Sequence, residues 1–295
     1  MSEALAPARS SSLLRDLIAL TKPRIISLLL LTTVVPMYIA GRPDGWLVLT
    51  VLVGGYLMAG GANAVNMYLD RDIDDRMART RLRPIPGGRM SPRGVLAFGI
   101  ALATAATWLL AYFANVVAAT VALAGFYCYV FVYTSWLKRT TPQNIVIGGA
   151  AGAIPPLVGW TAMTERIDLA AVYLFLIVFY WTPPHFWALA ILKQRDYGNA
   201  RVPMAPLVWG ERETTRQMVW YTIILVALTI LPATFGALGA IYLISATVLG
   251  AIFLAAVLRL ATATELEGPA RIVWRYSLVY LALLFAAMAL DRAIL

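Results

Sequence analysis

The sequence is poor in charge and almost devoid of cysteine. Only 13% of its 295 residues are charged and 61% are hydrophobic, whereas a soluble domain has about 25% charged and about 45–50% apolar residues. This composition excludes a soluble enzyme, a disordered chain and a fibrous protein. Cys128 is the only cysteine, which excludes a disulfide framework and a metal site built from cysteines.

Charge is missing from long stretches of the chain. A membrane-crossing helix needs about 20 apolar residues, whereas strands of outer-membrane barrels are about 10 residues long and alternate in hydropathy. The long apolar runs therefore exclude a barrel and predict an all-α polytopic membrane protein. Its nine transmembrane helices are expected at residues 24–41, 46–69, 94–113, 115–135, 144–163, 169–192, 218–236, 239–258 and 273–290.

The basic residues are distributed unevenly between the two sides of this arrangement. Of the 24 Lys and Arg residues, 21 fall on one side, and only Arg42, Arg166 and Arg292 fall on the other. The positive-inside rule then places the N-terminus in the cytoplasm and the C-terminus outside. The net charge of +9 thus indicates membrane orientation and not a nucleic-acid partner.

The chain divides into a cytoplasmic N-terminal tail, residues 1–23, and one transmembrane domain, residues 24–295. We expect no cleavable signal peptide, because Glu3 and Asp16 interrupt the tail before the first span. The absence of a long presequence favours a bacterial cell (inner) membrane. Apolar residues 13–20 are compatible with a helix lying on the bilayer surface or with a loosely ordered tail.

Acidic residues gather at the cytoplasmic end of the second span. Asn66, Asp70 and Asp74 are four residues apart, so on a helix they share one face. Two carboxylates one turn apart repel each other, and Mg²⁺ compensates by binding carboxylates together with phosphate oxygens. The alternative is a solvated helix end with Asp–Arg pairs. Transporters usually carry charges near the midplane of the membrane, so this position favours a membrane-embedded central cavity open to the cytoplasm.

An arginine-rich loop follows these acids. Residues 76–89 contain five arginines together with prolines and glycines, and they include Arg79 and Arg83. Arginine binds phosphate through paired hydrogen bonds, so a loop that folds back over metal-binding acids indicates a diphosphate site. Arginines that only fix the membrane orientation are the alternative.

A second polar cluster follows the sixth span at residues 193–201, with Lys193 and Asp196. Thr21, Ile25 and Pro36 match Thr141, Ile145 and Pro156 in spacing. This match indicates a parallel repeat that brings the two polar loops together over one cavity.

His185, the only histidine, lies directly after Pro183 and Pro184 in the sixth span. Consecutive prolines disrupt helical hydrogen bonds, which a membrane tolerates beside protein or a cavity. His185 is therefore either a ligand of a bound molecule or a packed histidine bonded across helices. Asn144 is either a helix cap or a site residue, and Tyr133 belongs either to an aromatic cavity or to an interfacial belt.

These motifs resemble those of the UbiA-type intramembrane prenyltransferase superfamily, whose first signature matches Asn66-x3-Asp70-x3-Asp74. Three longer stretches are similar to the haem O synthase branch, the protohaem IX farnesyltransferases. They lie at residues 74–84, 133–156 and 182–197. The second signature of the superfamily usually has two aspartates, whereas the corresponding region of this chain has Asp196 together with Lys193 and Arg195.

The resemblance implies Mg²⁺-dependent transfer of a farnesyl group from farnesyl diphosphate to a vinyl group of haem B, giving haem O. It implies a catalytic set and a metal set that share Asp70, Asp74 and Asp196, with Asn66 assisting. Expected partners are farnesyl diphosphate, haem B, the bilayer, and a haem A synthase or oxidase assembly factors. The residues that it implies for substrate binding are Arg79, Arg83, Tyr133, Lys138, Arg139, Asn144, His185, Lys193 and Tyr197.

Two other functions stay open at this stage. A related prenyltransferase would use a quinone-type aromatic ring as acceptor. A secondary transporter or membrane haem carrier would perform no chemistry, but it would be expected to carry mid-membrane charges or to lack a metal cluster.

Overall fold

The computed structural model describes residues 12–234 and 238–294, and within these ranges the chain is helical and contains no strand. Nine of the described helical segments are long and apolar enough to cross a membrane. They are α2 (Pro23–Ala40), α3 (Gly45–Leu69), α5 (Pro92–Phe113), the segment Val116–Thr140, α8 (Asn144–Thr164), α9 (Leu169–Leu192), α12 (Glu211–Thr234), α13 (Ala240–Thr262) and α14 (Glu267–Ile294).

These bounds confirm the nine predicted spans, and the last two residues predicted for the seventh span, 235–236, lie outside the described part. The range predicted for α9 agrees at both ends, whereas α12 and α14 begin earlier than the apolar pattern indicated. Their first turns carry Glu211 and Glu267. Backbone hydrogen bonds do not require apolar side chains. A helix can therefore extend beyond its apolar residues where the chain leaves the membrane.

The segment Val116–Thr140 contains a feature that the sequence pattern did not predict. It consists of α6 (Val116–Tyr127), the π-helix η1 (Cys128–Leu137) and α7 (Lys138–Thr140). In η1 the Thr134 and Ser135 hydroxyls donate to carbonyls five residues back, those of Tyr129 and Val130, at 2.8 and 2.9 Å. Such π-turns often occur at functional sites.

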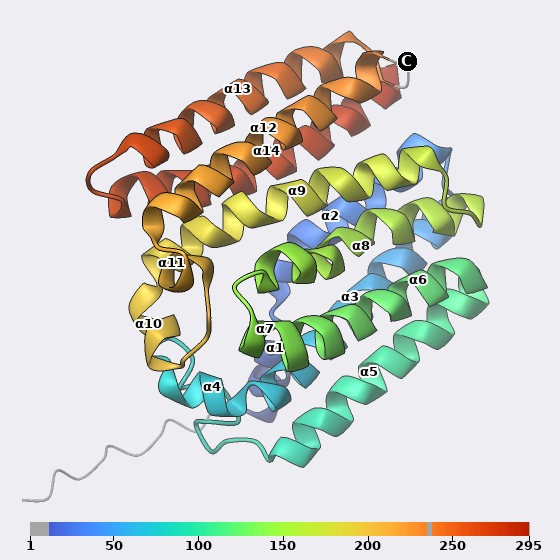
Figure 1. The fold of residues 1–295 in the computed structure, drawn as a ribbon. Helices are drawn as coiled ribbons and strands as arrows, with labels where there is room; N and C mark the ends of the chain where they lie inside the picture. Colours follow the sequence, from blue (N-terminus) through green and yellow to red (C-terminus); the bar gives the residue numbers. More distant parts are fainter. Residues whose placement is uncertain (1–11, 235–237, 295) are drawn as a thin grey trace, which may run out of the picture.

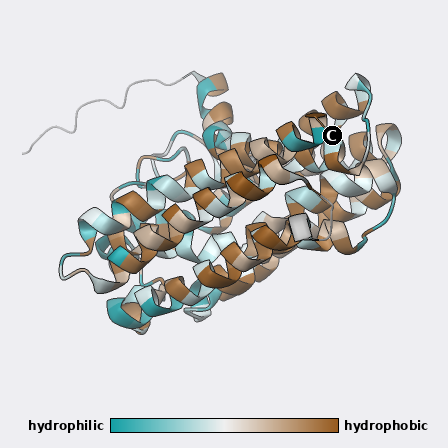
Figure 2. Ribbon diagram, turned by 90° about the horizontal axis from the view of Figure 1, so that it is seen from above, coloured by the Kyte–Doolittle hydropathy of each residue, from teal (hydrophilic) through white to brown (hydrophobic). Residues whose placement is uncertain are grey.

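The helices run roughly side by side (Figure 1). The last three, α12, α13 and α14, lie along one edge, α5 and α6 lie along the other, and α2, α8 and α9 lie between them. The short helices α1 (Leu13–Thr21), α4 (Arg71–Arg76), α10 (Gln194–Asn199) and α11 (Ala205–Val208) gather at one end. Figure 2 shows hydrophobic residues along the long helices and hydrophilic residues in the terminal turns and loops.

Small residues let the central helices approach closely. A Cβ atom on Gly159 in α8 would lie 1.7 Å from the carbonyl oxygen of Thr33 in α2. A Cβ on Gly61 in α3 would lie 2.6 Å from the Gly99 carbonyl oxygen in α5. Membrane helices associate largely through such close backbone packing, because lipid offers no hydrophobic driving force between them.

The consecutive prolines do not break the sixth span. Helix α9 continues through Pro183 and Pro184 to Leu192. Both prolines are buried, and a proline-containing helix is tolerated where neighbouring helices enclose it.

The described part of the N-terminal tail is a short helix. Helix α1 is capped by Ser12, and Leu13, Leu14 and Ile18 are exposed while Leu20 is fully buried. Arg89 binds the buried Asp16 carboxylate at 3.1 Å. This geometry favours a docked amphipathic helix over a loosely ordered tail for residues 13–21, while residues 1–11 lie outside the described part.

Candidate active site

The predicted face of three polar residues forms at the end of α3. The helix ends at Leu69, Asp70 is its C-cap, and α4 begins at Arg71. The helical hydrogen bonds nevertheless continue: the Asp70 and Asp74 amides donate to the carbonyls of Asn66 and Asp70 at 2.8 and 2.7 Å. Asn66, Asp70 and Asp74 keep the predicted spacing, and all three are buried.

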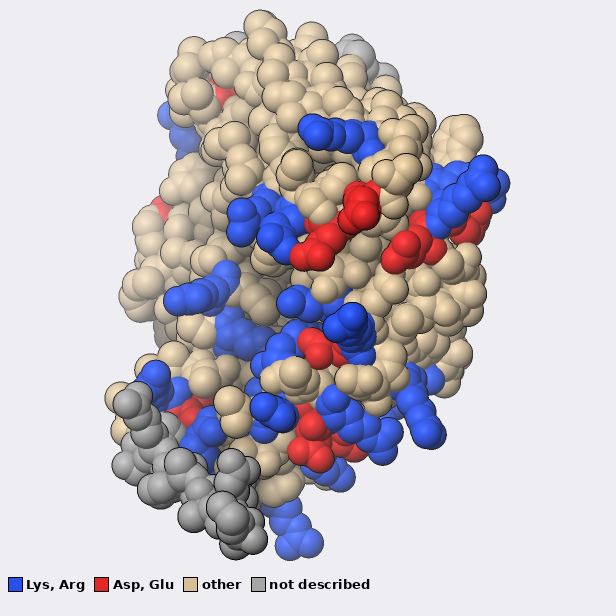
Figure 3. Space-filling model, turned by 90° about the vertical axis from the view of Figure 1, so that its left-hand side faces the viewer, with Lys and Arg blue, Asp and Glu red and all other residues tan. Residues whose placement is uncertain are grey.

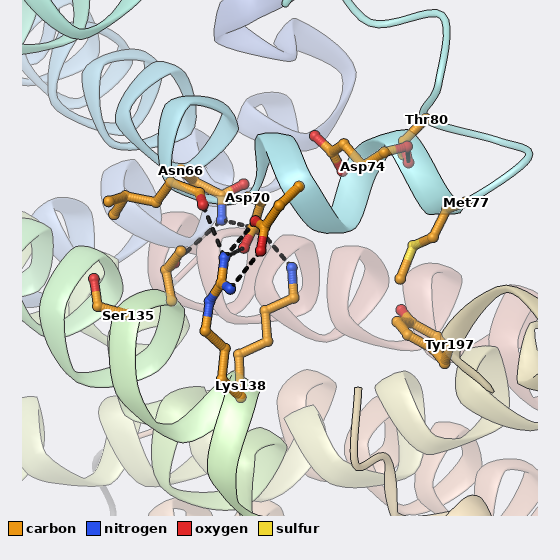
Figure 4. Close-up of polar contacts among 12 residues, drawn as sticks. Asn66, Asp70, Asp74, Met77, Thr80, Ser135, Lys138 and Tyr197 are labelled. Atoms are coloured by element: carbon orange, nitrogen blue, oxygen red, sulfur yellow. Dashed lines mark hydrogen bonds and ion pairs between the residues drawn. The ribbon is translucent and has the colours of Figure 1, made fainter. Parts of the chain in front are cut away.

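Asp70 lies at the centre of this group (Figure 4). Its Oδ2 accepts from the Asn66 amide at 2.7 Å and from Lys138 Nζ at 2.5 Å. The same Asn66 amide donates to Thr134 Oγ1 at 3.1 Å, so the π-helix η1 helps to position the aspartate. Arg139 reaches only to 3.9 Å of Oδ1, and Oδ1 is buried without a hydrogen bond.

Asp74 has its own cation. Arg83 Nη1 donates to both carboxylate oxygens at 2.8 and 2.7 Å, and the Thr80 hydroxyl donates to the Asp74 backbone carbonyl at 2.9 Å. These contacts fold the arginine-rich loop back over α4, as its prolines and glycines predicted. Two buried carboxylates thus each have a basic partner, which burial requires in the absence of another cation.

The donor set fits Mg²⁺. Carboxylate oxygens are hard ligands of the kind that Mg²⁺ prefers, and the orphaned Asp70 Oδ1 leaves one buried lone-pair site unsatisfied. Within residues 12–234 and 238–294, no three His, Cys, Asp or Glu side chains already lie close enough to hold an ion by themselves. A metal here would therefore need oxygens from a bound diphosphate or water to complete its coordination.

Lys22 is a member of the site that the sequence argument missed. It joins α1 to α2 with a positive φ of 57°, which is uncommon for a residue other than glycine. Its ammonium donates to the side-chain oxygens of Asn63 and Asn66 at 3.2 Å each. Burial, reinforced by the positive charges of Arg83 and Lys138, lowers the pKa of Lys22 to about 7.

The charges at this point do not balance. Lys22 interacts electrostatically with Arg83 and Lys138 and with the carboxylates of Asp70 and Asp74. Arg83 already pairs with Asp74 and Lys138 with Asp70, so Lys22 is a third basic group beside two carboxylates. A buried surplus of basic groups is a site for an anion, because the attraction is little screened by solvent. Figure 3 shows that basic and acidic side chains gather on this end of the molecule, which is hollowed between them.

The second polar segment meets the first, as the repeat predicted. Arg79 Nε lies 3.9 Å from the Asp196 carboxylate. Its Nη2 donates to the Tyr197 hydroxyl at 3.4 Å, and its guanidinium lies 5.5 Å from the Tyr197 ring centroid. In Figure 4 Tyr197 of α10 faces Met77 of the loop. Asp196 is the only carboxylate that this segment contributes.

Two predicted substrate-binding residues have other partners. Arg139 forms paired 2.8 Å hydrogen bonds to Asp72 and another to the Leu69 carbonyl, and its guanidinium lowers the pKa of Asp72 to about 2. Asn144 donates to the carbonyls of Thr141 and Pro203 at 2.6 and 3.2 Å. Arg139 therefore joins α7 to the junction of α3 and α4, and Asn144 joins the start of α8 to the segment before α11.

The remaining predicted residues are spread around the bundle. Tyr133 stacks on Tyr129 with 5.6 Å between ring centroids. Lys193 is the C-cap residue of α9. His185 contacts Ser277 of α14 and has no direct contact with the aspartates. The central cavity stays a prediction, because the pocket of about 170 Å³ beside α12 is lined by other residues, namely Gln143, Trp187, Trp209, Glu213, Gln217 and Tyr221.

Comparison with known proteins identifies related sequences over almost the whole chain. The model of the UbiA prenyltransferase family matches residues 28–290. A Roseiflexus protein called protoheme IX farnesyltransferase is 55% identical over 96% of this chain and 53% of its own length. Proteins of the same name from Gloeobacter violaceus and Symbiobacterium thermophilum are 49% and 47% identical, with 95% and 96% of their own lengths covered. The chain thus spans about half the length of the first of these curated relatives and nearly all of the other two.

Solved structures show the same fold. A digeranylgeranylglyceryl phosphate synthase superposes with a TM-score of 0.79 at 18% identity, covering 96% of this chain and 99% of that chain. A UbiA homologue from Archaeoglobus fulgidus, bound to DMAPP and Mg²⁺, superposes with a TM-score of 0.70 at 16% identity, covering 95% and 100%.

Proposed function

The chain belongs to the UbiA prenyltransferase family, and we propose that it transfers the farnesyl group of farnesyl diphosphate to a vinyl group of haem B. The bond between the farnesyl carbon and the diphosphate oxygen breaks, and diphosphate leaves with the electron pair. The vinyl group forms the new carbon–carbon bond, water adds to the resulting cation, and a proton is lost. The product is the hydroxyethylfarnesyl group of haem O.

The buried basic surplus around Asp70 and Asp74 is the observation that carries this proposal. A diphosphate brings negative charge that Lys22, Arg83 and Lys138 neutralise. These groups are fixed before the reaction, so they stabilise the charge that grows on the leaving group without reorganising. Arg79, beside Asp196 and Tyr197, adds a basic group from the loop.

Mg²⁺ is the proposed metal. Asp70 and Asp74 would hold it, with Asp196 contributing from the second segment and Asn66 orienting Asp70. The ion supplies Lewis-acid activation of the diphosphate. In its absence Lys138 and Arg83 neutralise the two carboxylates, so the same basic groups serve the empty and the loaded site.

We propose that the apolar helices next to the polar end of the bundle bind the isoprenoid chain. A farnesyl chain needs a hydrophobic surface, and exclusion of water protects its allylic cation from premature capture.

The protein is a multi-pass membrane protein. We propose that its polar end faces the cytoplasm, with the N-terminus inside and the C-terminus outside, because 21 of the 24 basic residues then lie inside. A haem A synthase or an oxidase assembly factor would receive the product.

Haem B is favoured over a quinone-type acceptor by the relatives that match nearly full length and share one name. The structure itself adds a buried histidine, His185, at the site of the specific Pro-Pro-His-Phe-Trp stretch. Histidine is a common ligand of haem iron.

The test is a product assay with purified protein in lipid nanodiscs. With haem B, radiolabelled farnesyl diphosphate and Mg²⁺, we expect a radiolabelled haem with the mass of haem O, and stoichiometric diphosphate. Asp70→Asn and Asp74→Asn should each reduce turnover at least about 1,000-fold, which corresponds to about 4 kcal/mol of transition-state stabilisation.

Asp75→Asn is the matched control, because Asp75 is adjacent in sequence and exposed. Its turnover should stay within twofold of the wild type. Prenylation of an added quinone without prenylation of haem B would transfer the proposal to the aromatic-acceptor class. Haem movement across the membrane without release of diphosphate would replace it with a carrier.

A further inference from the structure

His185 is held between α9 and α14. Its side chain is only 7% exposed, and its Nδ1 lies 2.7 Å from the Ser277 hydroxyl. The imidazole ring stacks on Trp181, one turn earlier, with 4.4 Å between centroids and 14° between planes. Trp181 in turn donates its indole N–H to the Ser277 carbonyl at 2.7 Å, so Ser277 anchors both rings.

The hydrogen bonds of Ser277 bear on which imidazole nitrogen of His185 carries the proton. A serine hydroxyl has one proton to donate, and Ser277 donates it to the Trp274 carbonyl at 2.7 Å. Towards His185 the hydroxyl oxygen can then only accept. Donation to the Trp274 carbonyl therefore favours the neutral tautomer in which Nδ1 is protonated and Nε2 carries the lone pair.

Nε2 has no hydrogen-bond partner among the described residues, since the only side-chain hydrogen bond of His185 is the one to Ser277. An imidazole nitrogen with a free lone pair can bind a metal ion that accepts the electron pair. Iron-binding and zinc-binding histidines almost always donate their other N–H to an oxygen acceptor, which fixes the ring and raises its basicity. Ser277 provides that acceptor here.

We propose that Ser277 is a positioning residue that holds His185 with Nδ1 protonated, so that Nε2 binds the iron of the acceptor haem. This inference rests on the proposed function, because it takes haem B as the acceptor. The coordinate bond uses the existing lone pair of Nε2, so no proton is released and no redox change is needed. The iron bond would fix the macrocycle relative to α9. The ring of Phe186 lies edge-on to the imidazole, with 5.0 Å between centroids.

The experiment measures haem binding to the full-length protein in nanodiscs, without farnesyl diphosphate or Mg²⁺. Haem B is titrated in, and the Soret band and the iron–histidine stretch of the ferrous form are recorded. The wild type should show a histidine-bound spectrum. Ser277→Ala removes the acceptor and shortens the side chain without adding volume, and it should weaken haem binding about 10-fold or more and lower the iron–histidine frequency.

Two further variants separate positioning from packing. Ser277→Thr keeps the hydroxyl and should restore the wild-type frequency. His185→Gly should lose the histidine-bound spectrum and regain it when imidazole is added, which also covers the case in which the threonine variant fails to fold.

An unchanged haem spectrum in His185→Gly would overturn the ligand assignment, and an unchanged affinity and frequency in Ser277→Ala would overturn the role of Ser277. If either result occurred while the wild type still made haem O, only this inference would fail. If the wild type bound no haem B at all, the proposed function would fail with it.

Discussion

Lys138 Nζ lies 2.5 Å from Asp70 Oδ2, joining the end of η1 to the end of α3. Asp70 is 1% exposed and the Lys138 side chain is 13% exposed, so this pair is largely shielded from solvent. It occupies the carboxylate that is proposed to bind Mg²⁺. The strength of the contact between the ends of η1 and α3 therefore depends on whether Mg²⁺ is bound to Asp70.

Lys138→Met should destabilise the protein by about 3 kcal/mol in EDTA, because it leaves a buried carboxylate without its cation. Mg²⁺ with a non-hydrolysable farnesyl diphosphate analogue should remove at least half of this loss, since the metal then neutralises Asp70. The measurement is thermal unfolding of purified protein in detergent. Arg76→Met, at an exposed position of the same end face, is the control and should unfold like the wild type. Equal destabilisation with and without the metal and analogue would contradict a metal site at Asp70.

Lys22 should make diphosphate binding depend on pH. Its pKa of about 7 means that the ammonium is increasingly neutral above that pH, whereas a bound anion favours the charged form. Affinity for inorganic diphosphate should therefore be strongest below pH 7 and fall as pH rises through and above 7. Calorimetric titration at several pH values measures this trend.

Lys22→Arg is the control for that profile. Arginine stays protonated over the whole range, so its affinity should fall less steeply than that of the wild type. Lys22→Met should bind diphosphate about tenfold more weakly at pH 6, since a hydrogen bond to a charged group contributes about 1.5–3 kcal/mol. Identical pH profiles for the wild type and Lys22→Arg would show that Lys22 does not titrate in this range.

Asp291 caps a neighbouring helix at the opposite end of the bundle. Its buried carboxylate in α14 accepts from the backbone amides of Gly239 and Tyr242, at the start of α13, at 2.5 and 3.1 Å. Asp291→Ala leaves these amides unpaired and should cost about 1–3 kcal/mol of stability. Turnover should persist at temperatures below the transition. Arg292→Ala alters the exposed neighbour and should have no measurable effect on unfolding.

Gly159→Ala should prevent close packing of α2 and α8. Its new methyl group would overlap the Thr33 carbonyl, whereas Gly152 in the same helix has open space at the corresponding point. We expect Gly159→Ala to cost about 3 kcal/mol or more, at or beyond the usual range for overpacking, and to aggregate on size-exclusion chromatography. Gly152→Ala should remain monodisperse. Normal elution of both variants would show that the α2–α8 contact can separate without loss of the fold.

The helices and the residue spacing within them follow from the amino-acid sequence alone. A run of about 20 apolar residues has few alternatives to crossing a bilayer as a helix, because lipid offers no partner for unpaired backbone groups. Asn66, Asp70 and Asp74 share a face for the same local reason, since one turn of helix separates each from the next. The repeat also indicated that the two polar loops would meet, and in the structure Arg79 and Asp196 form one of their contacts.

The pairing of each basic residue with its acid depends on how the helices pack. Lys138 and Asp70 are 68 positions apart, and His185 and Ser277 are 92 apart. Neither pairing follows from any periodicity. Lys22 was one of the 21 basic residues that indicated the orientation, and folding buries it beside Asn66. Arg139, predicted to bind substrate, lies beside Asp72. Local geometry is fixed by hydrogen bonds between near neighbours, whereas these charges find partners only after whole helices have packed, and that packing depends on every helix at once.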